Sequence, residues 1–171
     1  MRVALMMFSL LLSACQLSGK SADFDPARNY AGYQSWQWHA PAFSYAGDAA
    51  QNDLLEQRIA HTLTEQLAAK GLTHAQTQAD LKVHVRIEHK VYEDSYTTQI
   101  GSHFGGLGLY ETRTQQYPVQ ILTVDLLDGR DGRLIWRNQH EAFYDAYAHP
   151  NQRNQSIAQS LTRILQQYPP H

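Results

Sequence analysis

Cysteine, net charge and long apolar runs are all scarce in this chain of 171 residues. One cysteine cannot form a disulfide within the chain, so the fold depends on its hydrophobic core even in an oxidising compartment. A net charge of −2 argues against a nucleic-acid-binding protein, which would carry a basic patch for the phosphates. No apolar run reaches the roughly 20 residues that a membrane-spanning helix needs.

The rest of the composition is that of an ordinary globular protein. Hydrophobic residues make up 43% of the chain and charged residues 18%, which does not fit a disordered chain. The length suits one well-buried core and is short for two. Ten tyrosines and three tryptophans provide more aromatic surface than a minimal core requires.

The first fifteen residues have the parts of an export signal. Arg2 supplies a positive charge, and Val3 to Leu12 form an apolar run of the length expected in such a signal. Cys15 follows directly on Leu12-Ser13-Ala14. These last four residues resemble the lipobox of bacterial lipoproteins.

That resemblance implies that residues 1–14 are a signal peptide and that Cys15 is the first residue of the mature protein. It implies a diacylglycerol joined to Cys15 by a thioether and acylation of the freed amine, and two or more acyl chains hold a protein stably on a membrane. Gln16 stands where an aspartate would favour the inner membrane, so we expect an outer-membrane anchor. Residues 15–22 then form a short tether, and residues 23–171 form one domain that faces the periplasm.

Periodicity predicts the first half of the domain. A first strand is expected to end near Trp38, with residues 39–48 as a loop. A helix is expected from Asn52 or Asp53 to about Lys70, because apolar residues repeat every four positions on one stripe (Leu55, Ile59, Leu63, Leu67).

Further strands are expected at Ala79 to Tyr92, Tyr117 to Leu127 and Leu134 to Phe143, with a turn at Asp128 to Arg133. A last helix should run from about Gln152 to Gln167. The resulting order is β-α-β-β-β-α. It predicts an α+β fold, a two-layer sandwich in which both helices cover one face of a mostly antiparallel sheet.

The segment from Ser95 to Gln116 is rich in glycine and shows no clear periodicity, so we expect a mobile loop at its centre. Phe104, Tyr110 and Tyr117 lie in it or beside it. Aromatic residues bury much area at little entropic cost and are enriched at binding surfaces. These three residues are therefore the candidate contacts to a partner or ligand.

No motif for catalysis, a cofactor or a metal ion is complete. The stretch from His140 to Tyr144 would be a zinc motif only if residue 144 were histidine. His84 and His89 fall on opposite faces of the predicted strand. The run FGGLGLY lacks the spacing of a phosphate-binding loop, and the nucleophile motif GxSxG is absent. We expect no catalytic residue, no cofactor and no metal site.

Most of the mature chain, from Asp23 to Pro170, resembles the domain of unknown function 4136 family of bacterial lipoproteins. The resemblance rests on a glycine-rich middle and on the order and spacing of five stretches: DFDPARNYAGYQSWQW, DLLEQRIAHTLTEQLAAKGL, AQTQADLKVHV, VQILTVDLLDGRDGRLIWRNQHEA and ILQQYPP. It implies a compact α+β domain without an established activity, and it carries over no functional residue.

These observations favour a non-enzymatic lipoprotein domain that binds another component of the cell envelope, and we expect that component to be a protein. The first alternative is a carrier of a small apolar ligand or lipid, with a pocket between helices and sheet under the glycine-rich segment. The second is a hydrolase whose active site is dispersed along the sequence. The sequence leaves the oligomeric state open.

The lipid anchor predicts the behaviour of Cys15→Ala. Without the thiol, lipid cannot be attached, so the variant should remain an uncleaved precursor or appear as a soluble form. Fractionation of cells followed by immunoblotting measures this. If the variant still fractionates with the outer membrane as the wild type does, the anchor hypothesis is wrong.

Overall fold

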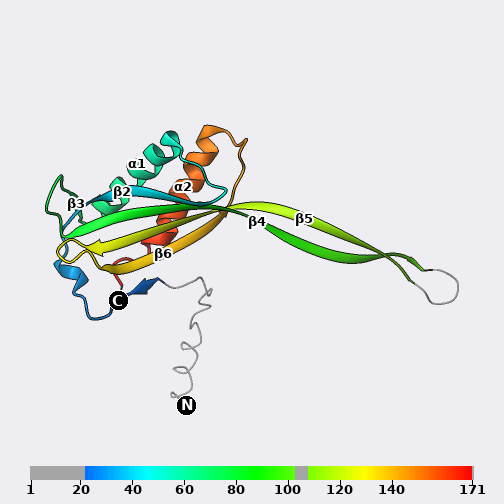
Figure 1. Ribbon diagram of the computed structural model, residues 1–171, viewed down its shortest axis with the longest axis horizontal. Coiled ribbons are helices and arrows are strands. Elements are labelled where there is room, and N and C mark those ends of the chain that lie inside the picture. The colour runs from blue at the N-terminus through cyan, green and yellow to red at the C-terminus, as the bar shows by residue number, and fades with distance from the viewer. Residues whose placement is uncertain (1–21, 103–107, 171) are drawn as a thin grey trace, which may run out of the picture.

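The computed structural model describes residues 22–102 and 108–170, which form one six-stranded sheet with two helices against it (Figure 1). The order of strands across the sheet is β1-β6-β5-β4-β2-β3. The strands are β1 (Asp23–Phe24), β2 (Ser35–Gly47), β3 (Thr73–His74), β4 (Leu81–Ser102), β5 (Gly108–Asp128) and β6 (Leu134–Phe143). The helices are α1 (Asp53–Ala69), α2 (Pro150–Leu165) and a short 3-10 helix, η1 (Tyr30–Gly32).

The sheet is mostly antiparallel, as predicted. β4 pairs with β5, β5 with β6 and β1 with β6 in antiparallel fashion. β2 pairs in parallel with β4 and with β3, because the chain crosses over through α1 between these strands. Both helices lie on the same side of the sheet in Figure 1, so the α+β sandwich is confirmed.

Helix α1 confirms the predicted stripe. Asn52 begins it by accepting a hydrogen bond on its side-chain oxygen from the Leu55 amide, at 3.1 Å. Its inward residues are fully buried, and Gly71 follows with φ of +84°, a conformation that favours glycine. The buried residues of α1 are Ile59, Leu63 and Leu67.

The core lies between the helices and one face of the sheet. Alternate residues of β4 and β5 point into it, and α2 covers them with a second apolar stripe. Trp36 and Trp136 are fully buried in this layer. The other members include Leu81, Val83, Val85 and Ile87 of β4, Leu122, Val124 and Leu126 of β5, and Ile157, Leu161, Ile164 and Leu165 of α2.

Strand β2 is longer than the sequence predicts. The expected loop after Trp38 is part of the strand, which continues to Gly47. The register with β4 shifts between Trp38 and Phe43, so the stretch that contains Pro41 bulges out and the ladder resumes at Phe43 opposite Val85. A proline has no amide hydrogen and is tolerated at such an irregularity, so Pro41 does not end the strand.

The expected loop at the centre of Ser95 to Gln116 falls on residues that the structure does not describe, and the segment on either side of it is strand. β4 and β5 stay paired from Leu81 opposite Asp128 to Ser102 opposite Gly108. Apolar and polar residues do not alternate along this stretch, because neither of its faces is buried. Hydrogen bonds between threonine and serine side chains support the strand pairing instead. Residues 103–107, at the centre of the predicted loop, lie outside the described residues, as do residues 1–21 with Cys15.

Three elements meet at Asp80, just before β4. One of its carboxylate oxygens accepts hydrogen bonds from the amides of Gln34 and Ser35, both at 3.0 Å, and from the Ser35 hydroxyl at 2.8 Å. The Gly129 amide donates to the Asp80 carbonyl at 2.7 Å. A Cβ at Gly129 would lie 2.0 Å from the Ala79 carbonyl oxygen, so this turn requires glycine.

Asp80→Asn should destabilise the protein, because the amide accepts hydrogen bonds less strongly than the carboxylate. Backbone donors from Gln34 and the Ser35 hydroxyl lower the pKa of the Asp80 carboxyl on folding. Its contribution is therefore present above the ordinary aspartate pKa of about 3.9 and is lost as the pH falls through the lower folded value.

Denaturant unfolding at neutral pH should show a loss of about 1–3 kcal/mol for Asp80→Asn. The difference from wild type should shrink below about pH 4. Asp94→Asn is the matched control, since Asp94 is exposed. Equal stability of wild type and Asp80→Asn at neutral pH would contradict this role.

Candidate functional site

The far halves of β4 and β5 form a two-stranded arm that projects from the body of the protein (Figure 1). We define the arm as residues 90–102 and 108–118. At about 3.3 Å per residue, it is about 40 Å long. No residue of the arm belongs to the core cluster of the described residues. The arm is therefore held by its own cross-strand pairs and by the strands that continue it into the body.

Both outer edges of the arm are open in the part of the chain that the structure describes. β2 ends its pairing with β4 at Gly47 opposite His89, and β6 ends its pairing with β5 at Phe143 opposite Val119. Beyond these points, apart from a hydrogen bond from the Tyr144 amide to the Pro118 carbonyl at 2.9 Å, each described strand of the arm pairs only with the other. Unpaired strand edges offer amide and carbonyl groups to a further strand.

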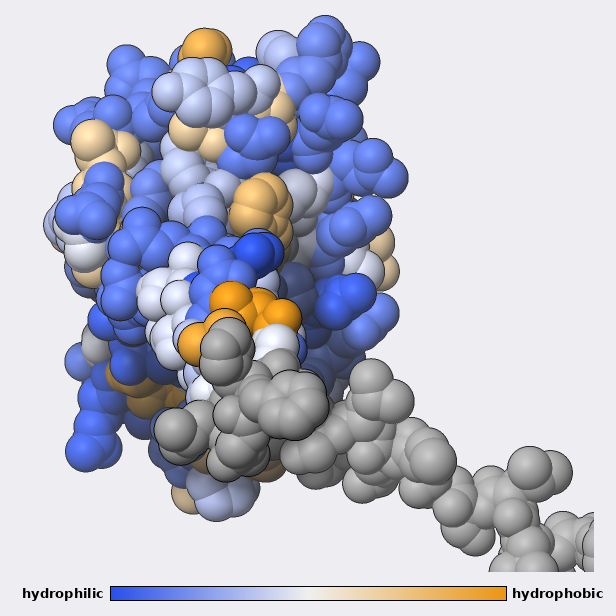
Figure 2. All heavy atoms as spheres, turned by 90° about the vertical axis from the view of Figure 1, so that its right-hand side faces the viewer, coloured by the Kyte–Doolittle hydropathy of each residue, from blue (hydrophilic) through white to orange (hydrophobic). Residues whose placement is uncertain are grey.

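Large apolar side chains are exposed near the end of the arm. Ile100 is 61% exposed, Leu109 55% and Tyr110 66%. Figure 2 views the molecule from the end that bears the arm and shows a compact apolar patch on a largely hydrophilic surface. Residues of this kind are normally buried, so their exposure marks a candidate contact surface.

The three residues predicted as contacts do not form one site. Tyr110 lies near the end of the arm, whereas Tyr117 lies at its base, where its ring is 5.7 Å from that of Tyr92. They are seven positions apart on the extended strand, or about 23 Å. Tyr117 is 39% exposed, and Phe104 lies outside the described residues. Of the three, Tyr110 is the one that the structure shows on a largely open surface.

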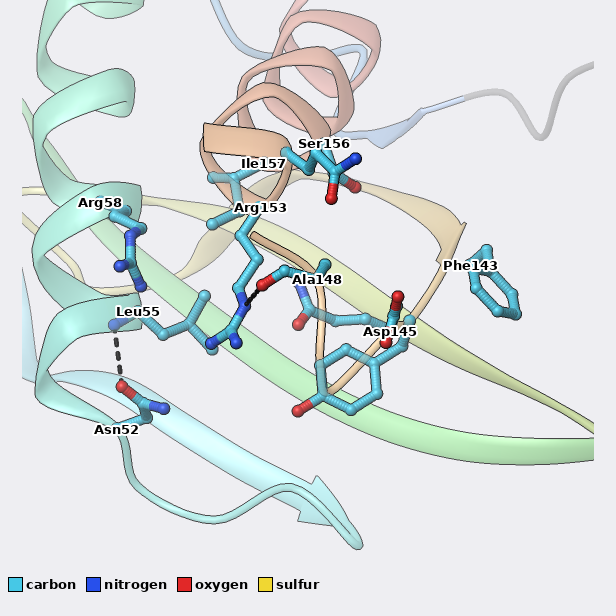
Figure 3. Close-up of a pocket in the computed structure, with 12 residues that line it drawn as sticks. Asn52, Leu55, Arg58, Phe143, Asp145, Ala148, Arg153, Ser156 and Ile157 are labelled. Atoms are coloured by element: carbon cyan, nitrogen blue, oxygen red, sulfur yellow. Dashed lines mark hydrogen bonds between the residues drawn. The ribbon is translucent and has the colours of Figure 1, made fainter. Parts of the chain in front are cut away.

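A cavity of about 320 Å³ lies at the base of the arm (Figure 3). It opens between the N-terminal halves of α1 and α2, the strands β5 and β6, and the loop that joins β6 to α2. The residues that line it are Asn52, Leu55, Arg58, Gln120, Phe143, Tyr144, Asp145, Ala148, Gln152, Arg153, Ser156 and Ile157. Sequence reasoning did not identify this site, because its walls come from four separate segments without a common motif.

Two arginines face this cavity from the two helices. Arg153 donates from Nε to the Ala148 carbonyl at 2.9 Å and from Nη2 to the Ala146 carbonyl at 3.1 Å, so it holds the loop before α2. The Arg58 side chain is half-buried and forms no hydrogen bond or ion pair with any described residue. In Figure 3 both side chains extend towards the space beside Leu55.

The sheet face opposite the helices carries a charged cluster. Asp125, 7% exposed, accepts hydrogen bonds from Arg137 through both carboxylate oxygens, at 2.6 and 2.7 Å. His84 Nδ1 lies 3.6 Å from Asp125, and burial lowers the pKa of the His84 imidazole. The carboxylate is thus engaged by the guanidinium, which makes the cluster a cross-strand link of β5 and β6.

His84 and His89 lie on opposite faces of β4. His84 faces Asp125, whereas the His89 ring stacks on Tyr144 at 4.0 Å between ring centres. Among residues 22–102 and 108–170, no three or more histidine, cysteine, aspartate or glutamate side chains gather as metal ligands would. Within the same residues, no helix has the length and apolar character needed to cross a membrane.

Solved structures with the same fold are remote in sequence. A DUF4136 family protein from Bacteroides thetaiotaomicron is 14% identical, with a TM-score of 0.53 over 86% of this chain and 94% of that one. A PDZ domain protein from Parabacteroides distasonis is 13% identical, with a TM-score of 0.52 over 88% of this chain. The match covers 35% of that longer protein, so the present chain corresponds to about a third of it.

PelC from Paraburkholderia phytofirmans, a dodecamer in its crystals, is 12% identical, with a TM-score of 0.49 over 84% of this chain and 91% of PelC. At these identities the likeness concerns the fold alone. Comparison with curated proteins gives no match. The family profile of the domain of unknown function DUF4136 matches residues 20–170, and the chain therefore belongs to the DUF4136 family.

Proposed function

We propose that this protein is a non-enzymatic lipoprotein of the outer membrane, facing the periplasm, and that its arm binds another protein of the cell envelope. The lipobox at Cys15 supports the anchor and the compartment. The arm is the observation that supports the binding role. It is a long element that contributes nothing to the core cluster, yet it keeps its strands in register almost to the end of β4.

The chemistry of the arm favours a partner that adds a β-strand. Both edges of the arm present unpaired backbone groups, and strand addition turns such groups into hydrogen bonds. Ile100, Leu109 and Tyr110 provide apolar area near the end, where a few large side chains can supply most of the binding energy. An isolated hairpin is only marginally stable in water, so an added strand would also stabilise the arm.

The non-enzymatic assignment is supported by two carboxylates that already accept hydrogen bonds within the fold. Asp125 is held by Arg137, and Asp80 by backbone amides and the Ser35 hydroxyl. The alternative of a hydrolase with a dispersed site makes a different prediction, namely turnover in a broad screen of ester and peptide substrates. Turnover that survives purification to homogeneity would overturn the assignment.

The cavity at the base of the arm supports a second candidate function, a carrier of a small ligand. It lies between the helices and the sheet, as the carrier hypothesis requires. It does not lie under the glycines of the Ser95 to Gln116 segment, because the two that the structure describes, Gly101 and Gly108, are at the far end of the arm. The carrier role and the arm role use different surfaces and can be tested separately.

Site-specific crosslinking in intact cells tests the arm. A photo-reactive residue at position 110 should give one dominant protein adduct, identified by mass spectrometry. The same residue at Lys82, on the sheet face of the body, is the control and should not give that adduct. If both positions give the same crosslinked proteins, or if neither gives any, the proposal is contradicted.

A shortened arm provides the matched loss-of-binding variant. Residues 95–114 are replaced by Asn-Gly, which joins Asp94 and Gln115, two residues that face each other in register, through a two-residue hairpin turn. Thermal unfolding should stay close to that of wild type, because the removed residues lie outside the core cluster. Reciprocal purification of the crosslinked partner should recover the wild type and not this variant.

A further inference from the structure

We propose that the cavity at the base of the arm binds a small amphiphilic anion. Its carboxylate group would pair with Arg58, and its apolar chain would lie along Leu55, Ile157 and Phe143. This inference rests on the carrier function named above and specifies its ligand. It is independent of the partner-binding role of the arm.

The charges of the lining favour an anion. Two arginines and one carboxylate, that of Asp145, face the cavity, so its lining is positive overall. Asp145 accepts a hydrogen bond from the Tyr147 amide at 2.8 Å and lies towards Phe143 in Figure 3, away from Arg58. A half-buried guanidinium without a described partner keeps its donors available to a ligand, and guanidinium pairs with carboxylate in a bidentate manner.

The two arginines differ in what they can do. Arg153 already holds the carbonyl groups of Ala146 and Ala148, so it shapes the wall of the cavity. The Arg58 side chain forms no such hydrogen bond with a described residue. Both helices begin beside the cavity, at the capping residues Asn52 and His149, so the positive ends of their dipoles add to the same field. Arg58 is therefore the residue that can be changed without disturbing the fold.

The apolar lining suits a short chain. Ile157 is 4% exposed and forms part of the inner wall, while Phe143 is 67% exposed at the rim. A chain between them would cover an aromatic ring that now faces water, which is favourable in proportion to the area removed from it. A volume of about 320 Å³ is at the small end of ligand cavities, which fits a single medium-length chain and not a phospholipid with two.

Decanoate is the probe, with decanol and decyltrimethylammonium as neutral and cationic controls of equal chain length. Calorimetric titration of the mature domain below the micellar concentration should show saturable binding of decanoate. Arg58→Gln should weaken this binding about tenfold or more, since a charge-assisted pair is lost. Arg163→Gln, near the other end of α2 and outside the cavity lining, is the matched control and should change it less than about twofold.

A second variant tests the location of the ligand without removing a charge. Ser156→Trp fills the cavity from α2 while both arginines remain, and it should also abolish decanoate binding. If decanol binds as tightly as decanoate and Arg58→Gln has no effect, the anion inference is wrong while an apolar carrier remains. If none of the three probes binds, both the inference and the carrier function fail. Binding that survives Ser156→Trp would place the ligand elsewhere and overturn the proposed site.

Discussion

The pairing of β4 with β5 is the interaction on which the rest of the structure depends. Within the body, one face of this hairpin supplies Val83, Val85 and Val124 to the core that it shares with both helices, and α2 packs against β5. Its outer edges there are covered by β2 and β6. Beyond His89 the same two strands lose both the helices and their neighbouring strands, yet the register continues. One hairpin thus serves as the centre of a core and as an arm without one.

The sequence predicts those parts of the fold in which burial is one-sided. The stripe of α1, the alternation from Leu81 to Ile87 and the bounds of β6 all follow from one face in the core and one in water, and the structure confirms them. The sequence does not predict the strands of the arm for the same reason, because a ribbon exposed on both faces has no apolar period to detect. The expected loop at residues 39–48 is largely strand, because a register shift accommodates Pro41 within β2.

For the candidate sites, the sequence indicates single residues but not which of them come together in the fold. Tyr110 could be selected from the sequence as an aromatic residue in an unusual segment, but its separation from Tyr117 depends on the strand geometry. The cavity could not be predicted, because Arg58, Gln120, Phe143 and Arg153 become neighbours only when both helices dock on the sheet. The exposed ring of Phe143 and the unpaired guanidinium of Arg58 are properties of the folded chain. They have no signature in local composition.

We infer that the hairpin is one ladder with two separate stabilities, and amide hydrogen exchange of the isolated mature domain measures them. Amides of β4 from Leu81 to Glu88 should exchange only through global unfolding, because the core closes over them. Amides of the arm, from Val91 to Gln99, should exchange much faster through local opening, with little dependence on denaturant. Protection of the arm equal to that of the core would contradict the claim, because the arm would then be part of the same cooperative unit.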